Sequence, residues 1–306
     1  MMIAVSIFQS TLKRIPMAFY YLLADVLYLI GYRLFGYRKA VVQKNLKAAF
    51  PEMTEEARLS IEKKFYRHLS DYLVETSAMS RLTAHELKKR FQFNNLELLH
   101  EYYRKHKNVI LASGHQSNWE WMALLPLYVG QEAKAVYRKQ SSPFADEVIY
   151  ANRSKFGMEL VQDKDLLPYL KHQDNKQPQL LYMLCDQRPS ESKKPTILEF
   201  MHQPVAAFQG LNFISRMFDY EVIYADIRKT ARGKYEVTFK ALQPSAEESV
   251  VECFFKQLER SIEAQPHTYL WSHNRWKNPP ATPLALKKNQ AAKGIPLFRL
   301  NQLEIA

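Results

Sequence analysis

Residues 108–125, NVILASGHQSNWEWMALL, show the local pattern that decides the fold. The apolar run VILA at 109–112 predicts a buried strand at 108–113, and the Ser-Gly-His turn at 113–115 ends the run. Ser117 is a preferred residue for a helix N-cap, so we expect a helix to begin there and to cover residues 118–128. A strand, a turn and a helix in succession are the building unit of a sheet covered by helices.

The same alternation continues along most of the chain. Further strands are expected at 134–138, 159–162, 179–185, 196–200, 221–227 and 235–242. Helices are expected between them at 144–156, 164–173, 207–218 and 246–264, and before them at 39–50 and 55–79, with a capping box of Thr83 and Glu86. This order predicts the α/β class, with a mixed, mostly parallel sheet flanked by helices.

The composition excludes several classes of protein. The 306 residues are 47% hydrophobic and 24% charged, which is close to globular averages and excludes disordered, collagenous and polytopic membrane chains. Two cysteines, Cys185 and Cys253, cannot build a disulfide framework. A net charge of +12 favours a polyanionic partner, either nucleic acid or an anionic lipid surface. The basic residues are scattered and no nucleic-acid motif is present, so we expect a membrane surface and no nucleic acid.

The N-terminal segment, residues 1–37, has the composition of a membrane anchor. Between Ile15 and Tyr32 the run IPMAFYYLLADVLYLIGY carries one charge, Asp25, in 18 residues, or about 27 Å of helix. Basic residues flank both ends of the run. We interpret it as an anchoring helix that either dips into the membrane or spans it. The alternative is a buried first helix, because Asp25 interrupts the run. An α/β domain at 38–280 and a tail at 281–306 complete the predicted organisation.

His115 and Glu120 are the candidate catalytic pair. The carboxyl ends of strands collect ligands in open α/β sheets, and His115 lies in such a turn. On one continuous helix the two side chains would point about 140° apart, so they converge only if Glu120 lies in the first turn of a helix capped by Ser117. A histidine held by a carboxylate is a general base for an alcohol. The alternatives are a structural histidine and a Glu120 that only completes a capping box. The spacing is not that of a zinc site, so no metal is expected.

Seven blocks of the sequence resemble one family. The H-x4-E spacing is similar to the H-x4-D/E signature of glycerolipid-type acyltransferases. More narrowly, the chain resembles the bacterial lipid A biosynthesis (lauroyl/myristoyl) acyltransferases of the lysophospholipid acyltransferase superfamily. The further matching blocks, in order, are KNLKAAFP (44–51), VYRK (136–139), ANRSKFG (151–157), LCDQRP (184–189), FMHQPVAAFQG (200–210) and YLWSHNRWKNPP (269–280).

The resemblance implies an activity and a set of residue roles. It implies an O-acyltransferase at the cytoplasmic face of the inner membrane, which moves a fatty acyl group from an acyl carrier protein or coenzyme A thioester to a hydroxyl of a lipid A precursor or related glycolipid. His115 is then the general base and Glu120 orients it, without a covalent intermediate, cofactor or metal. The resemblance further implies that substrate is bound by Arg138, Arg153, Asp186 and Arg275.

The chain departs from the family pattern along the expected substrate wall. Cys185 and Arg188 replace a proline and an acid, Met201-His202 replaces a Phe-Gly pair, and Ala207 takes the position of a hydroxyl residue. The acyl length and the acceptor therefore stay open. Alternatives are a lysophospholipid or aminolipid acyltransferase with the same mechanism, and a non-catalytic protein that binds anionic lipid.

Overall fold

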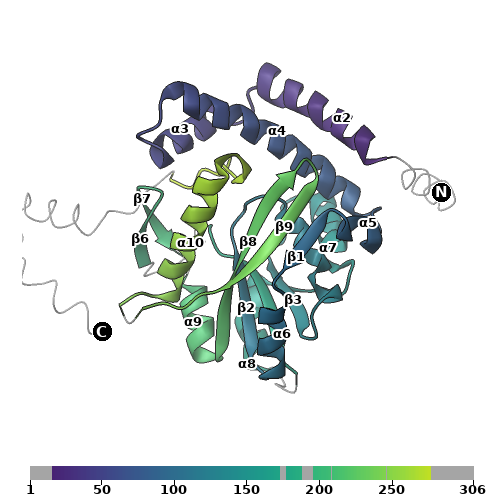
Figure 1. The fold of residues 1–306 in the computed structure, drawn as a ribbon, viewed down its shortest axis with the longest axis vertical. Coiled ribbons are helices and arrows are strands. Elements are labelled where there is room, and N and C mark those ends of the chain that lie inside the picture. The colour runs from purple at the N-terminus through teal and green to yellow at the C-terminus, as the bar shows by residue number, and fades with distance from the viewer. Residues whose placement is uncertain (1–15, 173–176, 188–195, 208, 246, 277–306) are drawn as a thin grey trace, which may run out of the picture.

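A seven-stranded sheet forms the centre of the molecule (Figure 1). The computed structural model describes residues 16–172, 177–187, 196–207, 209–245 and 247–276. Its strand order is β1-β9-β8-β2-β5-β3-β4, and every neighbouring pair is parallel except β8 and β9. The strands are β1 (Phe91–Asn94), β2 (Asn108–Ser113), β3 (Glu132–Tyr137), β4 (Glu159–Gln162), β5 (Gln179–Leu184), β8 (Tyr220–Ala231) and β9 (Lys234–Ala241). The predicted α/β class with a mixed, mostly parallel sheet is confirmed.

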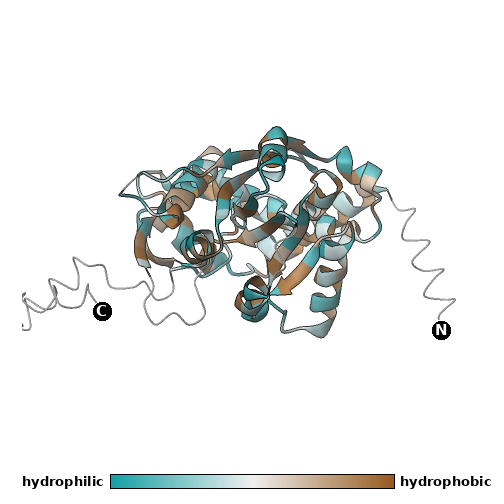
Figure 2. Ribbon diagram, turned by 90° about the horizontal axis from the view of Figure 1, so that it is seen from below, coloured by the Kyte–Doolittle hydropathy of each residue, from teal (hydrophilic) through white to brown (hydrophobic). Residues whose placement is uncertain are grey.

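Strand β2 is buried on both faces, which explains its continuous apolar sequence. Val109 and Leu111 pack into one apolar cluster, while Ile110 and Ala112 pack into another on the opposite face. This alternation is the two-residue period of a strand between two layers. The apolar residues along the central strands are visible in Figure 2.

Helices cover both faces of the sheet and one of its ends. They are α2 (Met17–Tyr28), α3 (Lys39–Ala49), α4 (Glu55–Met79), α5 (Ala84–Lys88), α6 (Glu97–Arg104), α7 (Pro143–Ser154), α8 (Leu166–Lys171), α9 (Gly210–Met217) and α10 (Val250–Ala264), with a π-helix η1 (Leu29–Leu34) and 3₁₀ helices η2 (Trp119–Leu127), η3 (Asp163–Asp165) and η4 (Pro266–Thr268). Figure 1 shows α4 across the top of the sheet and α2 beside it. The predicted capping box of Thr83 and Glu86 is present.

Some elements differ from the prediction. Strand β6 (Thr196–Phe200) does not join the large sheet but pairs with β7 (Gln203–Ala207) in a separate antiparallel hairpin. The sequence did not indicate β7, where Pro204 weakens the strand pattern, nor the four-residue β1. Helix α6 was also missed. The helix expected at 118–128 forms, but as the 3₁₀ helix η2 with Pro126 inside it.

The apolar N-terminal run is helical, as predicted. Helix α2 continues into η1, and together they form an 18-residue helix that is long and apolar enough to cross a membrane by length and composition. Residues 1–15 and the predicted tail at 281–306 lie outside the described residues. The division of the chain at residues 37 and 280 stays a prediction.

Candidate active site

His115 lies directly beyond the carboxyl end of β2, in a segment held by the chain after α10. Gly114 precedes it because a Cβ there would lie 2.6 Å from Cδ1 of Leu258 in α10. The carbonyl of His115 accepts a hydrogen bond from the backbone N–H of Leu270 at 3.0 Å. Gln116 and Tyr269 form an antiparallel bridge. These contacts fix the backbone, while the imidazole keeps 15% of its surface exposed.

The carboxylate that holds the imidazole belongs to Asp186. Nδ1 of His115 lies 2.6 Å from Oδ1 of Asp186, whose side chain is fully buried. Strand order explains the pairing, since β2 and β5 are parallel neighbours in which Ser113 lies opposite Leu184. Two residues beyond each strand, the same register places His115 opposite Asp186.

Two further donors fix Asp186 and keep it ionised. Its Oδ2 accepts hydrogen bonds from the hydroxyl of Tyr269 at 3.0 Å and from Nη2 of Arg275 at 2.9 Å. Burial acts to raise the pKa of Asp186, but the charges of His115 and Arg275 and the hydrogen bond from His115 outweigh it and hold the pKa below its ordinary value. An ionised carboxylate only accepts, so Nδ1 of His115 donates its proton to Asp186, and in the neutral imidazole the lone pair is then on Nε2.

Nε2 of His115 has the side-chain amide of Gln187 as its partner. The side-chain nitrogen of Gln187 lies 3.1 Å from Nε2 and donates to it. The ring of Trp119 packs edge-on against the imidazole, with 5.1 Å between the ring centres. Sequence reasoning did not single out Gln187 or Tyr269. The available signal was their position, because Gln187 follows Asp186 directly and Tyr269 opens the last matching block.

Glu120 is held by Arg153, which corrects the expectation that it orients His115. Nε and Nη2 of Arg153 donate to Oε2 and Oε1 of Glu120 at 2.7 and 2.8 Å, and Nε1 of Trp119 donates to Oε1 at 3.0 Å. Burial acts to raise the pKa of Glu120, but the charge and hydrogen bonds of Arg153 outweigh it and lower the pKa. The charge of His115 also lowers this pKa, so Glu120 acts on the imidazole through space.

The predicted Ser117 cap is wrong, and so is the capping-box alternative for Glu120. Ser117 has φ of 57°, in the left-handed region, whereas an N-cap residue needs an extended backbone. Its Oγ donates to the carbonyl of Ile227 at 2.8 Å. Helix η2 begins at Trp119 after Asn118, which provides no side-chain cap.

The structure brings five of the six predicted site residues together, as the His115 imidazole and two buried ion pairs beside it. Asp186 pairs with Arg275 on one side, and Glu120 pairs with Arg153 on the other. Arg138, the sixth, is exposed and donates to Asp163 at 2.7 Å. Contact of these arginines and of Asp186 with substrate stays a prediction.

Replacing Glu120 with glutamine is expected to lower the free energy of unfolding by about 3–5 kcal/mol, because it leaves the Arg153 charge without its carboxylate. Urea denaturation measures the loss. The matched control is Glu120→Gln combined with Arg153→Met, which removes both charges and is expected to recover most of the stability. If the single variant were as stable as the wild type, the ion pair would have no structural role.

Glu75 of α4 links α2 to the segment 115–120, which carries His115 and Glu120. Its Oε2 accepts from Nδ2 of Asn118 at 2.7 Å and from the hydroxyl of Tyr235 at 2.8 Å, and its Oε1 accepts from the hydroxyl of Tyr21 at 3.1 Å. Burial raises the pKa of Glu75 to about 7, against the opposing hydrogen bonds of Tyr235 and Asn118 and the charge of Lys229. Asn118 lies between His115 and Glu120, so α4 supports the segment that carries both residues.

The free energy of unfolding of the wild type is expected to fall relative to that of Glu75→Gln between pH 4.5 and pH 7. Unfolded Glu75 releases its proton near pH 4.5, whereas folded Glu75 keeps it to about pH 7, so the folded state binds more protons in this window. The two pKa values differ by about 2.5, which corresponds to about 3 kcal/mol.

Urea denaturation across this pH range checks the prediction. The matched control is Glu86→Gln, because the pKa of Glu86 is lowered by its capping hydrogen bonds and its pH dependence has the opposite sign. A pH-independent difference between wild type and Glu75→Gln would show that Glu75 is ionised throughout.

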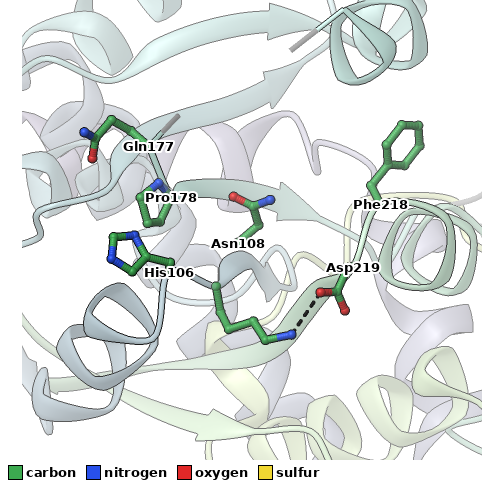
Figure 3. A pocket seen from close by; sticks show the side chains of 7 residues that line it. His106, Asn108, Gln177, Pro178, Phe218 and Asp219 are labelled. Atoms are coloured by element: carbon green, nitrogen blue, oxygen red, sulfur yellow. Dashed lines mark hydrogen bonds and ion pairs between the residues drawn. The ribbon is translucent and has the colours of Figure 1, made fainter. Parts of the chain in front are cut away.

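A separate hollow lies at the opposite ends of β2 and β5 (Figure 3). Its lining includes His106, Asn108 and Pro178, together with an ion pair in which Nζ of Lys107 lies 2.9 Å from Oδ2 of Asp219. It shares no residue with the group around His115. We therefore assign the candidate active site to the carboxyl ends of the strands.

The chain is similar to known proteins of one family. A family model described as bacterial lipid A biosynthesis acyltransferase matches residues 3–278. A lipid A biosynthesis acyltransferase of Haemophilus influenzae is 22% identical over 233 residues, which cover 75% of this chain and 72% of the relative. A lipid A biosynthesis palmitoleoyltransferase of Escherichia coli is 22% identical over 247 residues, with 79% and 80% covered.

Among solved structures, the 1-acyl-sn-glycerophosphate acyltransferase PlsC of Thermotoga maritima aligns with a TM-score of 0.35 and 13% identity, covering 85% of this chain and 97% of that one. The family model, in contrast, spans nearly the whole chain, including His115, Glu120, Asp186 and Arg275. The chain is an acyltransferase, and it belongs to the bacterial lipid A biosynthesis acyltransferase family.

Proposed function

We propose that this chain is a membrane-bound O-acyltransferase of the inner membrane, with its site at the cytoplasmic face. It transfers a fatty acyl group from an acyl carrier protein or coenzyme A thioester to a hydroxyl of a lipid A precursor or related glycolipid. The observation that carries the proposal is the His115–Asp186 pair, in which a buried carboxylate holds Nδ1 and leaves Nε2 as the base. Family membership supplies the acyl chemistry and the acceptor class.

In the proposed reaction, Nε2 of His115 takes the proton of the acceptor hydroxyl while the hydroxyl oxygen attacks the thioester carbonyl. A carbon–oxygen bond forms and the carbon–sulfur bond breaks. The leaving thiolate then takes the proton from the imidazolium, so the products are an ester and a free thiol. Asp186 stabilises the imidazolium during the transfer. A hydroxyl can reach Nε2 only when Gln187 gives up its hydrogen bond there.

Arg153 and Arg138 are the proposed contacts for negative charge on the substrates. Glu120 uses two N–H groups of Arg153, and a guanidinium carries five, so donors remain for a phosphate or for the developing oxyanion. Arg138 is exposed and forms one ion pair on the surface, which a substrate phosphate can replace at small cost.

The test combines the purified chain with acyl-carrier-protein and coenzyme A thioesters of matched acyl lengths. Lipid A precursor and a lysophospholipid are supplied as separate acceptors, and the products are analysed by mass spectrometry. We expect a new ester on the lipid A precursor. Transfer only to the lysophospholipid would overturn the acceptor, and thioester hydrolysis without transfer would overturn the proposed reaction. Mass spectrometry of the lipids from a strain that lacks this protein identifies the acyl group that the protein transfers in the cell.

A further inference from the structure

Most polar side chains of α2 and η1 face the protein, and the exception is Arg33, which is exposed near the end of η1. Tyr21, Asp25, Tyr28 and Tyr32 recur every three or four residues and form one stripe along the helix. Each of them has a partner in the folded domain. These partners are Glu75 for Tyr21, Arg232 for Asp25, Arg67 for Tyr28 and Tyr66 for Tyr32. The helix is therefore docked on the domain over its whole length.

The opposite face of the same helix is apolar and exposed. Phe19, Leu22, Val26, Leu29, Leu34 and Phe35 are all exposed, with Leu34 at 76% and Phe35 at 79%. An apolar stripe of this length needs an apolar partner, since soluble proteins rarely leave one uncovered. Figure 1 shows this helix on the outside of α4, away from the sheet.

An ion cluster at the middle of the helix argues against a spanning orientation. Asp25 lies near the centre of Met17–Leu34 and accepts from Nη2 of Arg232 at 2.7 Å. Arg232 also donates to Asp71 at 2.8 Å, and Nζ of Lys229 lies 3.0 Å from the same carboxylate. A helix of 18 residues is only about as long as the hydrocarbon core is thick. Crossing the bilayer would therefore carry these four charges to its midplane, where charged side chains are rare and costly.

Three cationic side chains of the domain lie over tyrosine rings at successive positions along the helix. The guanidinium of Arg81 lies 4.2 Å from the ring centre of Tyr20, that of Arg67 lies 5.2 Å from Tyr28, and Nζ of Lys39 lies 5.1 Å from Tyr32. If the apolar face of the helix is inserted among the acyl chains, these three cations lie at the depth of the lipid headgroups. Anionic phosphates there can pair with them.

We propose that α2 and η1 lie in the plane of an anionic membrane surface, with the apolar face inserted into one leaflet and the stripe of tyrosines and Asp25 on the protein. The inference rests on the proposed function for the identity of the membrane. The proposal adds to that function how the active site around His115 is oriented relative to the membrane. Only α4 separates this helix from the catalytic segment, because Glu75 of α4 bonds Asn118 and Tyr72 of α4 bonds Glu120. A lipid acceptor thus reaches His115 from the leaflet on which the protein sits.

The first test is the topology of the full chain. Protease-cleavable tags are placed before residue 1 and after residue 306, and protease is added to sealed membrane vesicles of known orientation. An in-plane helix leaves both tags on the same side, so both are cleaved together. Tags on opposite sides would show a spanning helix and overturn the proposal.

The second test is binding to vesicles with no substrate present. Leu22→Glu combined with Phe35→Glu is expected to weaken binding to phosphatidylglycerol/phosphatidylethanolamine vesicles at least tenfold. The matched control is Leu167→Glu combined with Met217→Glu, which changes two exposed apolar residues of α8 and α9 and is expected to stay within twofold of wild type. Thermal unfolding confirms that both variants fold.

Other outcomes would assign the face differently. If Leu22→Glu/Phe35→Glu binds vesicles as the wild type does but no longer self-associates, the apolar face is instead an interface with a second copy of the chain.

Acyl transfer is measured separately on acceptor dissolved in detergent. Vesicle binding through this face without acyl transfer would contradict the proposed function alone. Acyl transfer without vesicle binding through this face would contradict only the in-plane orientation of α2 and η1.

Discussion

Replacing His115 with alanine is expected to lower kcat for acyl transfer by a factor of about 10²–10⁴, the usual contribution of a positioned general base. Without the imidazole, the acceptor hydroxyl keeps its proton as it approaches the thioester. Asp186 still has Arg275 and Tyr269 as partners, so the variant is expected to fold. Initial rates on purified protein, with saturating donor and acceptor, measure the effect.

Two controls separate the loss of chemistry from a loss of structure. The melting temperature and vesicle binding of His115→Ala are expected to match those of the wild type, because the backbone of this segment is held by Leu270 and Tyr269 rather than by the imidazole. His172→Ala, which alters an exposed histidine at the end of α8, is expected to transfer at the wild-type rate. Transfer by His115→Ala at near the wild-type rate would remove the base from the proposed mechanism.

The fold could be predicted largely because its signals are local. Strand 108–113 and helix 55–79 form with the expected bounds. A buried strand can be recognised from a short continuous apolar run, and a long amphipathic helix from apolar residues at helical spacing. The shortest strands gave mixed results, since β4 was predicted with its observed bounds whereas β1, also of four residues, was missed. Residues 196–200 form a strand as expected, but periodicity cannot tell which sheet a strand joins.

The partner of the base could not be predicted because it depends on strand order. Asp186 lies 71 positions from His115 and meets it only because β5 lies beside β2. The local candidate, Glu120, looked suitable because a helix capped by Ser117 would place Glu120 in its first turn, close to His115. Tertiary contacts override that pattern, since the carbonyl of Ile227 binds the Ser117 hydroxyl and the carbonyl of Thr268 binds its backbone N–H.

Replacing Asp186 with asparagine is expected to lower kcat by about 10²–10⁴ and to destabilise the fold as well. A neutral amide does not support the imidazolium, and an amide N–H donated to Nδ1 favours the tautomer in which Nε2 carries the proton and cannot act as a base. The Arg275 side chain, only 4% exposed, also loses its carboxylate, which is expected to cost about 3–5 kcal/mol. Steady-state kinetics and urea denaturation measure the two effects.

The double variant Asp186→Asn/Arg275→Met separates positioning from stability, because it removes both buried charges. Its stability is expected to return toward that of the wild type, while its kcat stays low.

Since folding lowers the pKa of Asp186, the stabilising effect of the wild-type carboxylate is fully present above its ordinary pKa of 3.8 and is lost as the pH falls further. The two variants are therefore compared with the wild type well above this pH. Recovery of kcat together with stability would mean that Asp186 serves only to neutralise Arg275. Glu120, which interacts with His115 through space, would then be the carboxylate that supports the base.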